Sequence, residues 1–496
     1  MKHTLLRTSL SVILLAALLA SCGEQAGTEP TEKTTDPVVT EAPTTAEPED
    51  SLPADLDLEG KTMKLFIANY ANSFYDDMYS AEETGNRISD AVYQAINHVE
   101  DRLNTTLEYT SEEYVYGDMP KMKAKITGIV LANDPAIDLY FDVDNYSMQM
   151  LDNPYFIDLS DTPYINLDSP WYDSAIVDVL PGDYVYCLTG NFALANIKYS
   201  YVTFFNTGLL STLDIDEDLY KTVESGKWTV SHMQELIKGT YQDLNGDSQV
   251  GPEDRFGLTF GDVNKFLGLG SSCGVDIFTK NGDKYDFTYG TERTANVMAS
   301  LQSFVNECID VEPPLVLSNA SSQKDSGSGN KASIQFLEGR SLFSMGLIAD
   351  APAIIPEVDF TCGILPMPKF AEEDEYHSPT QRHCYAFIPT SSAEQDYASA
   401  TLEALSSAFY HIVNPEFVEV TLKTRYSADD NVSRMYDLIM QTHSFETYDV
   451  FESLLNAPGI LIKDALEKST INWASSIERS KEKWEAQMEK ATQVVW

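Results

Sequence analysis

The chain has 496 residues, of which 43% are hydrophobic and 11% aromatic, so it is long and apolar enough to form full cores in two or three domains. Its 77 acidic residues outnumber 33 Lys and Arg residues, which gives a formal net charge of −44. Nucleic-acid binding requires basic patches opposite the phosphates, so this charge excludes a nucleic-acid partner from our expectations. It suits an exported, soluble protein that tolerates calcium.

The N-terminus predicts an export signal. Lys2 and Arg7 precede an apolar run from Leu10 to Ala20 that is too short to span a bilayer. No later apolar run approaches the length that is needed to cross a membrane. The run continues into Ser21-Cys22 and is similar to a bacterial lipobox. That similarity implies cleavage before Cys22 and acylation of Cys22, with palmitate among the acyl chains. The lipid would hold a soluble domain at the membrane surface; an ordinary secretory signal with a chance cysteine is the alternative.

A tether is predicted next. Residues 23–53 consist almost entirely of Thr, Glu, Pro and other polar residues, with hardly an aromatic or aliphatic side chain. Such a segment buries too little apolar surface to offset its ordering entropy, so it should be disordered and self-repelling. We therefore expect a signal peptide over residues 1–21, a tether over 22–55 and folded structure from about Leu56.

The folded part begins with an α/β pattern. Met63–Tyr70 has the composition of a buried strand, and Ile88 to Leu103 shows apolar residues at helical spacing. A second helical pattern around Ile126 leads into another apolar strand at Ala136–Val143. Strand, helix, helix, strand at these lengths predicts parallel pairing with crossover helices, and hence an α/β lobe.

Residues 183–496 are predicted to contain further strands, helices and one exposed loop. Asp183–Leu210 contains two strand-like runs around a polar centre, and Thr229 is placed to cap a helix. A Ser/Gly/Asn stretch at 318–330 predicts an exposed loop. Further elements are a helix and strand in ASIQFLEGRSLFSMG, strands in CGILPMPKF and RHCYAFIPT, and a helical C-terminal third ending in an amphipathic stretch with Ile477, Trp484 and Met488.

An acidic loop, DLNGDSQVGPED from Asp243 to Asp254, has the spacing of a calcium-binding loop. Asp243, Asn245, Asp247 and Asp254 stand at relative positions 1, 3, 5 and 12, and Gln249 at position 7 offers its backbone carbonyl. Glycine at position 4 and a closing Asp depart from an EF-hand. We predict a single structural Ca²⁺ clamp and no organic cofactor; a solvated turn is the alternative. Dockerins use similar loops, but in duplicated pairs within a small terminal module.

Together these segments resemble a known family. The lipobox, the acidic tether, GKWT followed by a helix and the acidic loop, EGRSLFSMG, GILPMPKF and RYSADDNVSRMYDLI are similar, in this order, to the extracellular solute-binding lipoproteins of ABC importers. Sugar-binding members such as those of the maltose-binding-protein-like family are the nearest analogy, and the similarity covers nearly the whole mature chain. Ser248, where the family often has Gly, and Cys362 and Cys384 depart from the pattern.

The resemblance implies a two-lobed periplasmic-binding-protein-like (type II) α/β fold with hinge strands between the lobes and a helical C-terminal part. We map the hinges near residues 187–206, 342–349 and 386–390. Lobe 1 would comprise residues 56–190 and 345–388, and lobe 2 residues 191–344 and 389–496. Hinges of this kind absorb a few backbone dihedral changes while each lobe moves rigidly.

Ligand sites in open α/β sheets lie beyond the carboxyl ends of strands. Sugars also need rings to stack on and planar polar groups that pair with hydroxyls. Trp171 is alternatively a packing anchor between lobes and Asp142 a cap for the following segment, whereas Arg382 is suited to a bidentate hydrogen bond. The expected ligand-binding residues are Asn69, Tyr70, Asp142, Asp144, Trp171, Asn196, Tyr199 and Arg382.

Enzyme motifs receive little support. Gly270 to Gly274 fits G-x-S-x-G, but a nucleophile elbow needs a strand entering and a helix leaving, and GLGSSCGVDIF reads as a small-residue loop. No zinc-protease, P-loop or dinucleotide-binding motif occurs. With 77 acidic residues, a carboxylate pair suited to glycoside hydrolysis is uninformative. The five cysteines after Cys22 form no C-x-x-C pair, so we expect buried thiols, with one disulfide left open.

We therefore expect a membrane-anchored extracellular solute-binding protein that captures a solute, favouring a carbohydrate or oligosaccharide, and delivers it to an ABC permease without covalent chemistry. Its partners would be the solute, the permease subunits and, through the lipid, the membrane; we expect a monomer. The alternatives are a surface glycoside hydrolase or esterase and a calcium-dependent surface adhesin.

Overall fold

The structure is a computed structural model that describes residues 50–70, 74–142, 148, 150, 154–261, 264–307, 323–325, 331–354, 357–419, 431–468 and 471–492. The predicted export signal, Cys22 and nearly all of the predicted tether lie outside these residues. So do Asp144, Cys308 and most of the predicted loop at 318–330. Across the described residues, no helix combines the length and apolar character that crossing a membrane requires.

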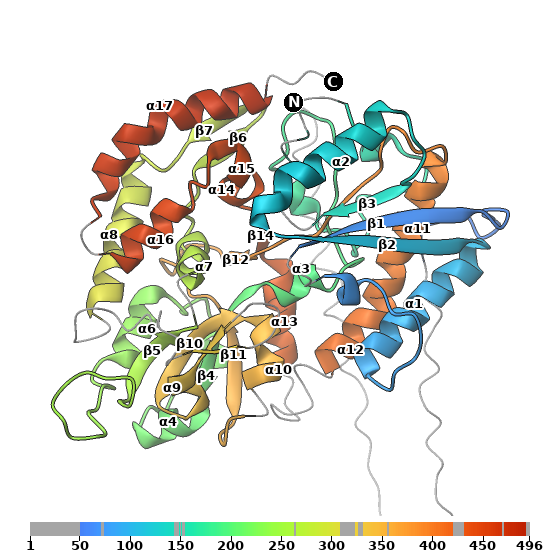
Figure 1. Ribbon diagram of the computed structural model, residues 1–496. Helices are drawn as coiled ribbons and strands as arrows, with labels where there is room; N and C mark the ends of the chain where they lie inside the picture. The colour runs from blue at the N-terminus through green and yellow to red at the C-terminus, as the bar shows by residue number, and fades with distance from the viewer. Residues whose placement is uncertain are drawn as a thin grey trace, which may run out of the picture. The chain divides into compact units, whose positions relative to one another are not determined.

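The first sheet has the strand order β13-β3-β1-β2; Figure 1 labels its strands β3, β1 and β2. β1 (Thr62–Tyr70) pairs in parallel with β2 (Thr106–Tyr114) and β3 (Leu139–Asp142), and β13 (Tyr385–Phe387) joins β3 in antiparallel orientation. The crossovers are helices α1 (Arg87–Leu103) and α2 (Met119–Leu131). The predicted α/β lobe is therefore present.

Helix α1 illustrates how the sequence determines these elements. Its N-cap Asn86 accepts hydrogen bonds from the N–H groups of Ile88 and Ser89, and Asn104 ends it in the left-handed region with φ 48°. One face is buried and consists of Ala91, Val92, Ala95, Ile96, Val99 and Leu103. The apolar spacing and both helix ends can be read directly from the sequence.

Strand β2 was missed by the sequence analysis, which passes from one helix to the next. Its sequence, TLEYTSEEY, buries only Leu107 and Tyr114, because β2 is an edge strand with a neighbour on one side only. Glu112 and its neighbours are solvent-exposed and polar, so neither strict alternation nor a continuous apolar run marks the strand. Exposed acidic side chains on an edge strand discourage pairing with other chains.

The second sheet has the order β11-β4-β10-β5. β4 (Tyr201–Asn206) is antiparallel to β10 (Ser341–Leu347) and β11 (Cys362–Pro366), whereas β10 is parallel to β5 (Phe256–Phe260). All residues of these four strands are buried, so the strands read as continuous apolar runs, as strands covered on both faces do.

Helices cover both sheets. α11 (Gln395–Ala408), the π-helical turn η7 (Phe409–Val413) and α12 (Asn414–Val418) pack against α1, and α13 (Asn431–Gln441) packs against β11 (Figure 1). α16 (Ile460–Glu467) contacts α7 (Lys265–Ser272) and α8 (Glu292–Glu307). α17 (Trp473–Thr492) lies along α8 and the hairpin strand β7 (Lys284–Phe287), and it buries Ile477, Trp484 and Met488 as its amphipathic pattern predicts.

Shorter elements complete the fold. They are η1 (Tyr75–Asp77), η2 (Tyr116–Asp118), η4 (Leu159–Asp161), η5 (Ser174–Ile176), α3 (Ala195–Lys198), α4 (Thr207–Thr212), α5 (Leu219–Glu224), α6 (Val230–Ile237), β6 (Phe278–Asn281), β8 (Gln323–Asp325), β9 (Lys331–Ser333), α9 (Ile334–Leu337), η6 (Ile348–Asp350), α10 (Ala351–Ile354), β12 (Ser378–Pro379), β14 (His443–Ser444), α14 (Thr447–Val450) and α15 (Glu452–Leu455). Thr229 caps α6 by accepting a hydrogen bond from the N–H of His232, as predicted.

The chain passes between the two sheets at three places. It leaves the first sheet after the bridge between Leu188 and Ala386 and enters the second at β4. It returns between β11 and β13, and it passes again between α12, which packs on α1, and α13. We call residues 188–200 and 367–384 the crossing segments.

The strand pairing divides the chain differently from the predicted lobe boundaries at two places. β11 lies inside the range that we assigned to lobe 1, yet it pairs with β4 of the second sheet. α11 lies inside the range assigned to lobe 2, yet it packs on α1 and β1 of the first sheet. The local sequence of neither element indicates a sheet, so only strand pairing and packing identify the sheet to which each belongs.

The segment GLGSSCG is helical, which corrects its interpretation as a loop. Residues 265–272 form α7, where Gly268 packs against the ring of Tyr201 and Gly270 against Ile462. The small residues therefore allow close packing of a buried helix. The four cysteines among the described residues, Cys187, Cys273, Cys362 and Cys384, are buried, and no disulfide joins any two of them.

Candidate functional site

Three predicted ligand residues gather beyond the carboxyl end of β1. The guanidinium carbon of Arg382 lies 5.1 Å from the ring centre of Tyr70, 5.9 Å from that of Phe74 and 5.4 Å from that of Tyr199. The rings of Phe74 and Tyr199 are 5.4 Å apart. We call these four residues the arginine–aromatic cluster; its position agrees with the expectation that ligands bind beyond strand ends.

Asn69 holds the backbone of the cluster residue Phe74 in place. Its Oδ1 accepts hydrogen bonds from the N–H groups of Phe74, at 3.0 Å, and Tyr75, at 3.3 Å. These bonds hold Phe74, which follows the end of β1 by four residues, against the strand end. Asn69 is only 2% exposed, so its described contacts give it a positioning role, whereas the half-buried Tyr70 offers ring surface.

The crossing segments supply the other two members. Tyr199 follows α3, and its carbonyl accepts a 2.9 Å hydrogen bond from the N–H of Gln381. Arg382 is the next residue, and it faces the rings, while the ring of its neighbour His383 packs against that of Phe445, with ring centres 4.3 Å apart and the planes tilted by 33°. Alternate residues of an extended segment point to opposite sides, so one segment serves the cluster and the buried core.

Arg382 differs from other arginines of the chain. Its Nη1 is buried and has no hydrogen-bond partner among the described residues. Arg87, Arg293 and Arg434 each form an ion pair with a carboxylate. Arg255 and Arg479 form no ion pair, but each donates a hydrogen bond to a backbone carbonyl. Within the described part of the chain, the Arg382 guanidinium contacts only aromatic rings, which leaves hydrogen-bond donors for another molecule.

A second layer supports Tyr70. Its ring meets that of Tyr114 edge-on at 5.3 Å, and the Tyr114 hydroxyl donates a 2.7 Å hydrogen bond to Asp142. The hydroxyl of Tyr140 donates to the other oxygen of Asp142 at 2.6 Å. Burial, reinforced by the charge of Asp142, raises the pKa of Tyr140 well above its ordinary value. Asp142 is 1% exposed, and in the described structure it anchors two tyrosines.

A cleft of 1080 Å³ lies beside the first crossing segment. Asp173, Asn191, Asn196 and His443 line it, together with Tyr410 of η7 and Tyr436 of α13. Its walls therefore come from the α1-packed helices and from α13. Its volume is near the upper end of the range for small-molecule pockets.

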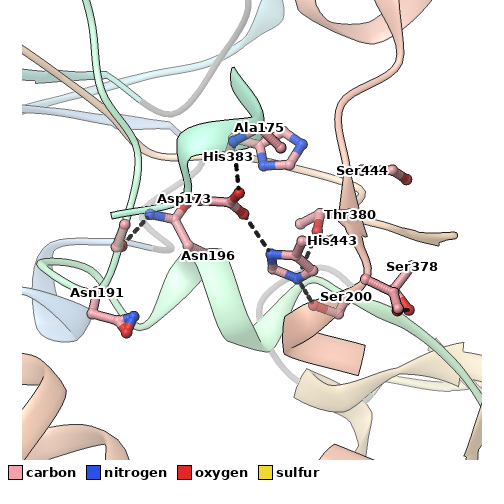
Figure 2. A network of polar contacts seen from close by, with 12 residues as sticks. Asp173, Ala175, Asn191, Asn196, Ser200, Ser378, Thr380, His383, His443 and Ser444 are labelled. Carbon is pink, nitrogen blue, oxygen red and sulfur yellow. Dashed lines mark hydrogen bonds and ion pairs between the residues drawn. The ribbon is translucent and has the colours of Figure 1, made fainter. Parts of the chain in front are cut away.

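A polar network forms part of the wall of this cleft (Figure 2). His443 Nδ1 lies 3.0 Å from Asp173 Oδ2, and its Nε2 lies 2.8 Å from Ser200 Oγ and 3.4 Å from Thr380 Oγ1. Asn196 ties the two crossing segments together: its Nδ2 donates to Gly190 O, and its Oδ1 accepts from the N–H of Cys384 at 2.6 Å. The network thus joins both crossing segments to His443 of β14 (His443–Ser444), which follows α13.

The order Asp173, His443, Ser200 is that of a hydrolase triad, but the serine is unsuited to attack a substrate. Ser200 is 0% exposed, and its backbone N–H donates to the carbonyl of Ile197. Nearby, burial, reinforced by His443, lowers the pKa of His383 to about 3, so His383 is neutral. In the segment fitting G-x-S-x-G, the Ser272 hydroxyl donates to the carbonyls of Leu269 and Pro368.

The remaining predicted ligand residues lie elsewhere or are already engaged. Trp171 is 6% exposed and contacts Tyr410 and His411, with ring centres 6.3 and 6.0 Å away. Both polar atoms of the Asn196 amide form hydrogen bonds with the backbone of the crossing segments. Tyr114 and His443 were not among the predicted ligand residues; neither has a local signal for this site, because their partners are 28 and 270 residues away.

The acidic loop folds around its own backbone. Asp243 accepts from the N–H groups of Gly246 and Ser248, and Asp247 accepts from that of Gln249. Asp254 is 0% exposed and accepts from Leu244, Gly251 and the Tyr241 hydroxyl. Within the described residues, no group of three or more His, Cys, Asp or Glu side chains is arranged to hold a metal ion.

Similarity to known proteins exists at the level of structure. No protein-family model and no curated protein sequence matches the chain. The substrate-binding protein Lmo0181 from Listeria monocytogenes, solved with cycloalternan, is 11% identical with a TM-score of 0.54, and the match covers 87% of this chain and 100% of that one. The GacH receptor of Streptomyces glaucescens is 13% identical with a TM-score of 0.53, covering 87% and 99%.

A third solved structure, a cyclo/maltodextrin-binding protein with maltotetraose, is 11% identical with a TM-score of 0.55, covering 88% of this chain and 99% of that one. Two of the three are described as binding proteins and the third as a receptor. The chain therefore shares the fold of these proteins, as the resemblance in sequence predicts. At these identities the likeness establishes the fold, and the function has to be argued from the site.

Proposed function

We propose that this protein is a solute-binding protein that captures a carbohydrate and delivers it to an ABC permease. The arginine–aromatic cluster is the observation that carries the proposal, because it places aromatic ring faces and free guanidinium donors beyond the end of β1. Aromatic faces and planar donors are what a sugar ring with its hydroxyls requires. The structural neighbours solved with cycloalternan and maltotetraose support this solute class.

Capture would work by closure of two lobes, one around each sheet. The crossing segments contribute Tyr199 and Arg382 directly to the cluster, so a solute bound there touches the segments about which the lobes would turn. A solute that contacts both lobes favours the closed state by its difference in affinity for the two states. The closed form would then be the one that docks on the permease.

We further propose that the protein is lipid-anchored at the outer face of a bacterial membrane through Cys22. The support is the short apolar run that ends in the lipobox-like sequence. Cys22→Ser should release the protein from the membrane fraction. An unchanged fractionation would contradict the anchor without touching the binding proposal.

We also propose that the acidic loop, from Asp243 to Asp254, binds a Ca²⁺ ion with a structural role. Ser248, at relative position 6, has φ 60°, the left-handed conformation that an EF-hand loop obtains from Gly at this position. Replacing Asp243 and Asp247 together by Ala should abolish any rise in thermal stability that calcium produces in the parent chain. The same rise in the parent and the double variant would contradict the proposal.

The binding proposal is tested by calorimetric titration of the full chain with maltotetraose, a galacto-oligosaccharide and oligogalacturonates. Tyr70→Ala should weaken the binding of whichever sugar binds by about tenfold, following the scale for aromatic contacts. Tyr184→Ala is the matched control, since Tyr184 is likewise half-buried but stacks on Tyr186 and donates its hydroxyl to Phe156 O, neither of which belongs to the cluster. Equal losses in both variants would contradict the assignment of the site.

A further inference from the structure

We propose that the solute is an acidic carbohydrate and that Arg382 binds its uronate carboxylate. This inference rests on the proposed function and narrows its solute class. The evidence lies in the charges around the arginine–aromatic cluster.

The first observation is that Arg382 has no carboxylate partner among the described residues, although the chain has 77 acidic residues. Its Nη1 is buried without a hydrogen-bond partner among the described residues. A buried N–H donor is costly to leave without an acceptor. Since acidic side chains are so abundant, the lack of one among the described neighbours of Arg382 leaves the position for a negative group that arrives with the solute.

The second observation is that the neighbouring charges are already paired. Lys198, which precedes Tyr199, contacts both oxygens of Asp77 at 2.7 and 3.0 Å. Asp142 accepts hydrogen bonds from two tyrosine hydroxyls. Of the two cations, Lys198 and Arg382, only Arg382 thus has no carboxylate partner among the described residues.

The third observation is the way in which the guanidinium is held. The ring centres of Tyr70, Phe74 and Tyr199 lie 5.1 to 5.9 Å from the guanidinium carbon, so the rings position the group without using its N–H donors. A guanidinium with free donors matches the two oxygens of a planar carboxylate in a bidentate pair. The half-buried ring of Tyr70 is then placed to contact the pyranose ring.

The protein as a whole repels such a solute, because its net charge is −44. Long-range attraction therefore cannot drive capture, and selectivity for an anion has to arise at short range from Arg382 itself. Removal of the Arg382 charge alone should therefore abolish the preference for acidic over neutral sugars.

The experiment is a calorimetric titration of the full chain with trigalacturonate and with its carboxyl-reduced, neutral counterpart. We expect trigalacturonate to bind at least about tenfold more tightly. Arg382→Gln should weaken trigalacturonate binding by about 10- to 100-fold, the scale of hydrogen bonds to charged groups, and remove the preference. Arg382→Lys keeps the positive charge but loses the paired N–H donors of the guanidinium. Its affinity for trigalacturonate should lie between those of the parent and Arg382→Gln. Arg293→Gln, at an exposed ion pair with Asp374, is the control and should bind as the parent does.

The outcomes separate this inference from the function on which it rests. Tighter binding of the neutral sugar, or a preference for trigalacturonate that survives in Arg382→Gln, would overturn the acidic-sugar inference and leave sugar capture intact. Binding of neither sugar, nor of any other carbohydrate, would overturn both. If Arg382→Gln does not fold, the parent chain's preference between the two sugars still decides.

Discussion

Glu446 should make the stability of the fold depend on pH in a way that a single substitution removes. The residue is 6% exposed and lies between β14 and α14, next to the polar network of His443. Its Oε1 accepts a 2.7 Å hydrogen bond from Ser444. Burial, reinforced by the charge of Asp276, raises the pKa of Glu446 from 4.5 to about 8.

The sign follows from where the proton resides. Between pH 4.5 and about 8 the folded protein keeps the proton on Glu446 and the unfolded chain releases it. Stability from this group is therefore fully present below pH 4.5 and is lost as the pH rises through about 8. Each pH unit in that interval costs about 1.4 kcal/mol, so the whole loss is of the order of 3–5 kcal/mol.

Glu446→Gln keeps the size and the acceptor for Ser444 but cannot ionise. Urea unfolding at a series of pH values should give nearly equal free energies for parent and variant at pH 5. At pH 9 the variant should be more stable by about 3–5 kcal/mol. Glu482→Gln, on the exposed face of α17, is the control and should follow the parent. Parallel curves for the parent and Glu446→Gln from pH 5 to 9 would refute the reasoning.

Three further substitutions test the packing. Gly363→Ala should lower the free energy of unfolding by about 1–3 kcal/mol in urea titrations, because its Cβ would lie 2.0 Å from the buried ring of Phe205; an unchanged midpoint would contradict the packing of β11 on β4. Ser248→Gly should raise the free energy of unfolding by about 0.5–1 kcal/mol, because the φ of 60° at this position favours glycine. A loss of stability in the same titration would argue against this loop conformation. Trp171→Ala should cost about 3 kcal/mol or more by removing a side chain that is 94% buried against η7, and a smaller loss measured by thermal unfolding would free Trp171 for a role in binding.

Local patterns predicted most of the fold. The apolar spacing of α1, the continuous apolar strands β1 and β10 and the Thr229 cap each follow from residues close in sequence, and the structure has all of them. β2 escaped because an exposed edge strand needs no apolar alternation. α7 escaped because the glycines of a closely packed helix resemble those of a loop.

The candidate site was only partly predictable. Tyr70, Tyr199 and Arg382 were chosen for their residue types and their places near strand ends, and the structure brings these three together. Asn69, Asp142 and Asn196 were chosen on the same grounds, but their polar groups hold backbone or tyrosine hydroxyls. Whether a polar side chain is free or engaged depends on partners distant in the chain, and no local pattern contains that information.

The central claim is that the protein captures a carbohydrate without changing it. The most direct measurement is a thermal-shift screen of the full chain against neutral and acidic mono- and oligosaccharides, amino acids and peptides, followed by mass spectrometry of any solute that binds. At about 100 times its dissociation constant a solute should add roughly 2.7 kcal/mol of stability, and the account predicts this for a carbohydrate that is recovered intact. Stabilisation by amino acids or peptides alone, or a carbohydrate recovered as cleaved products, would contradict it.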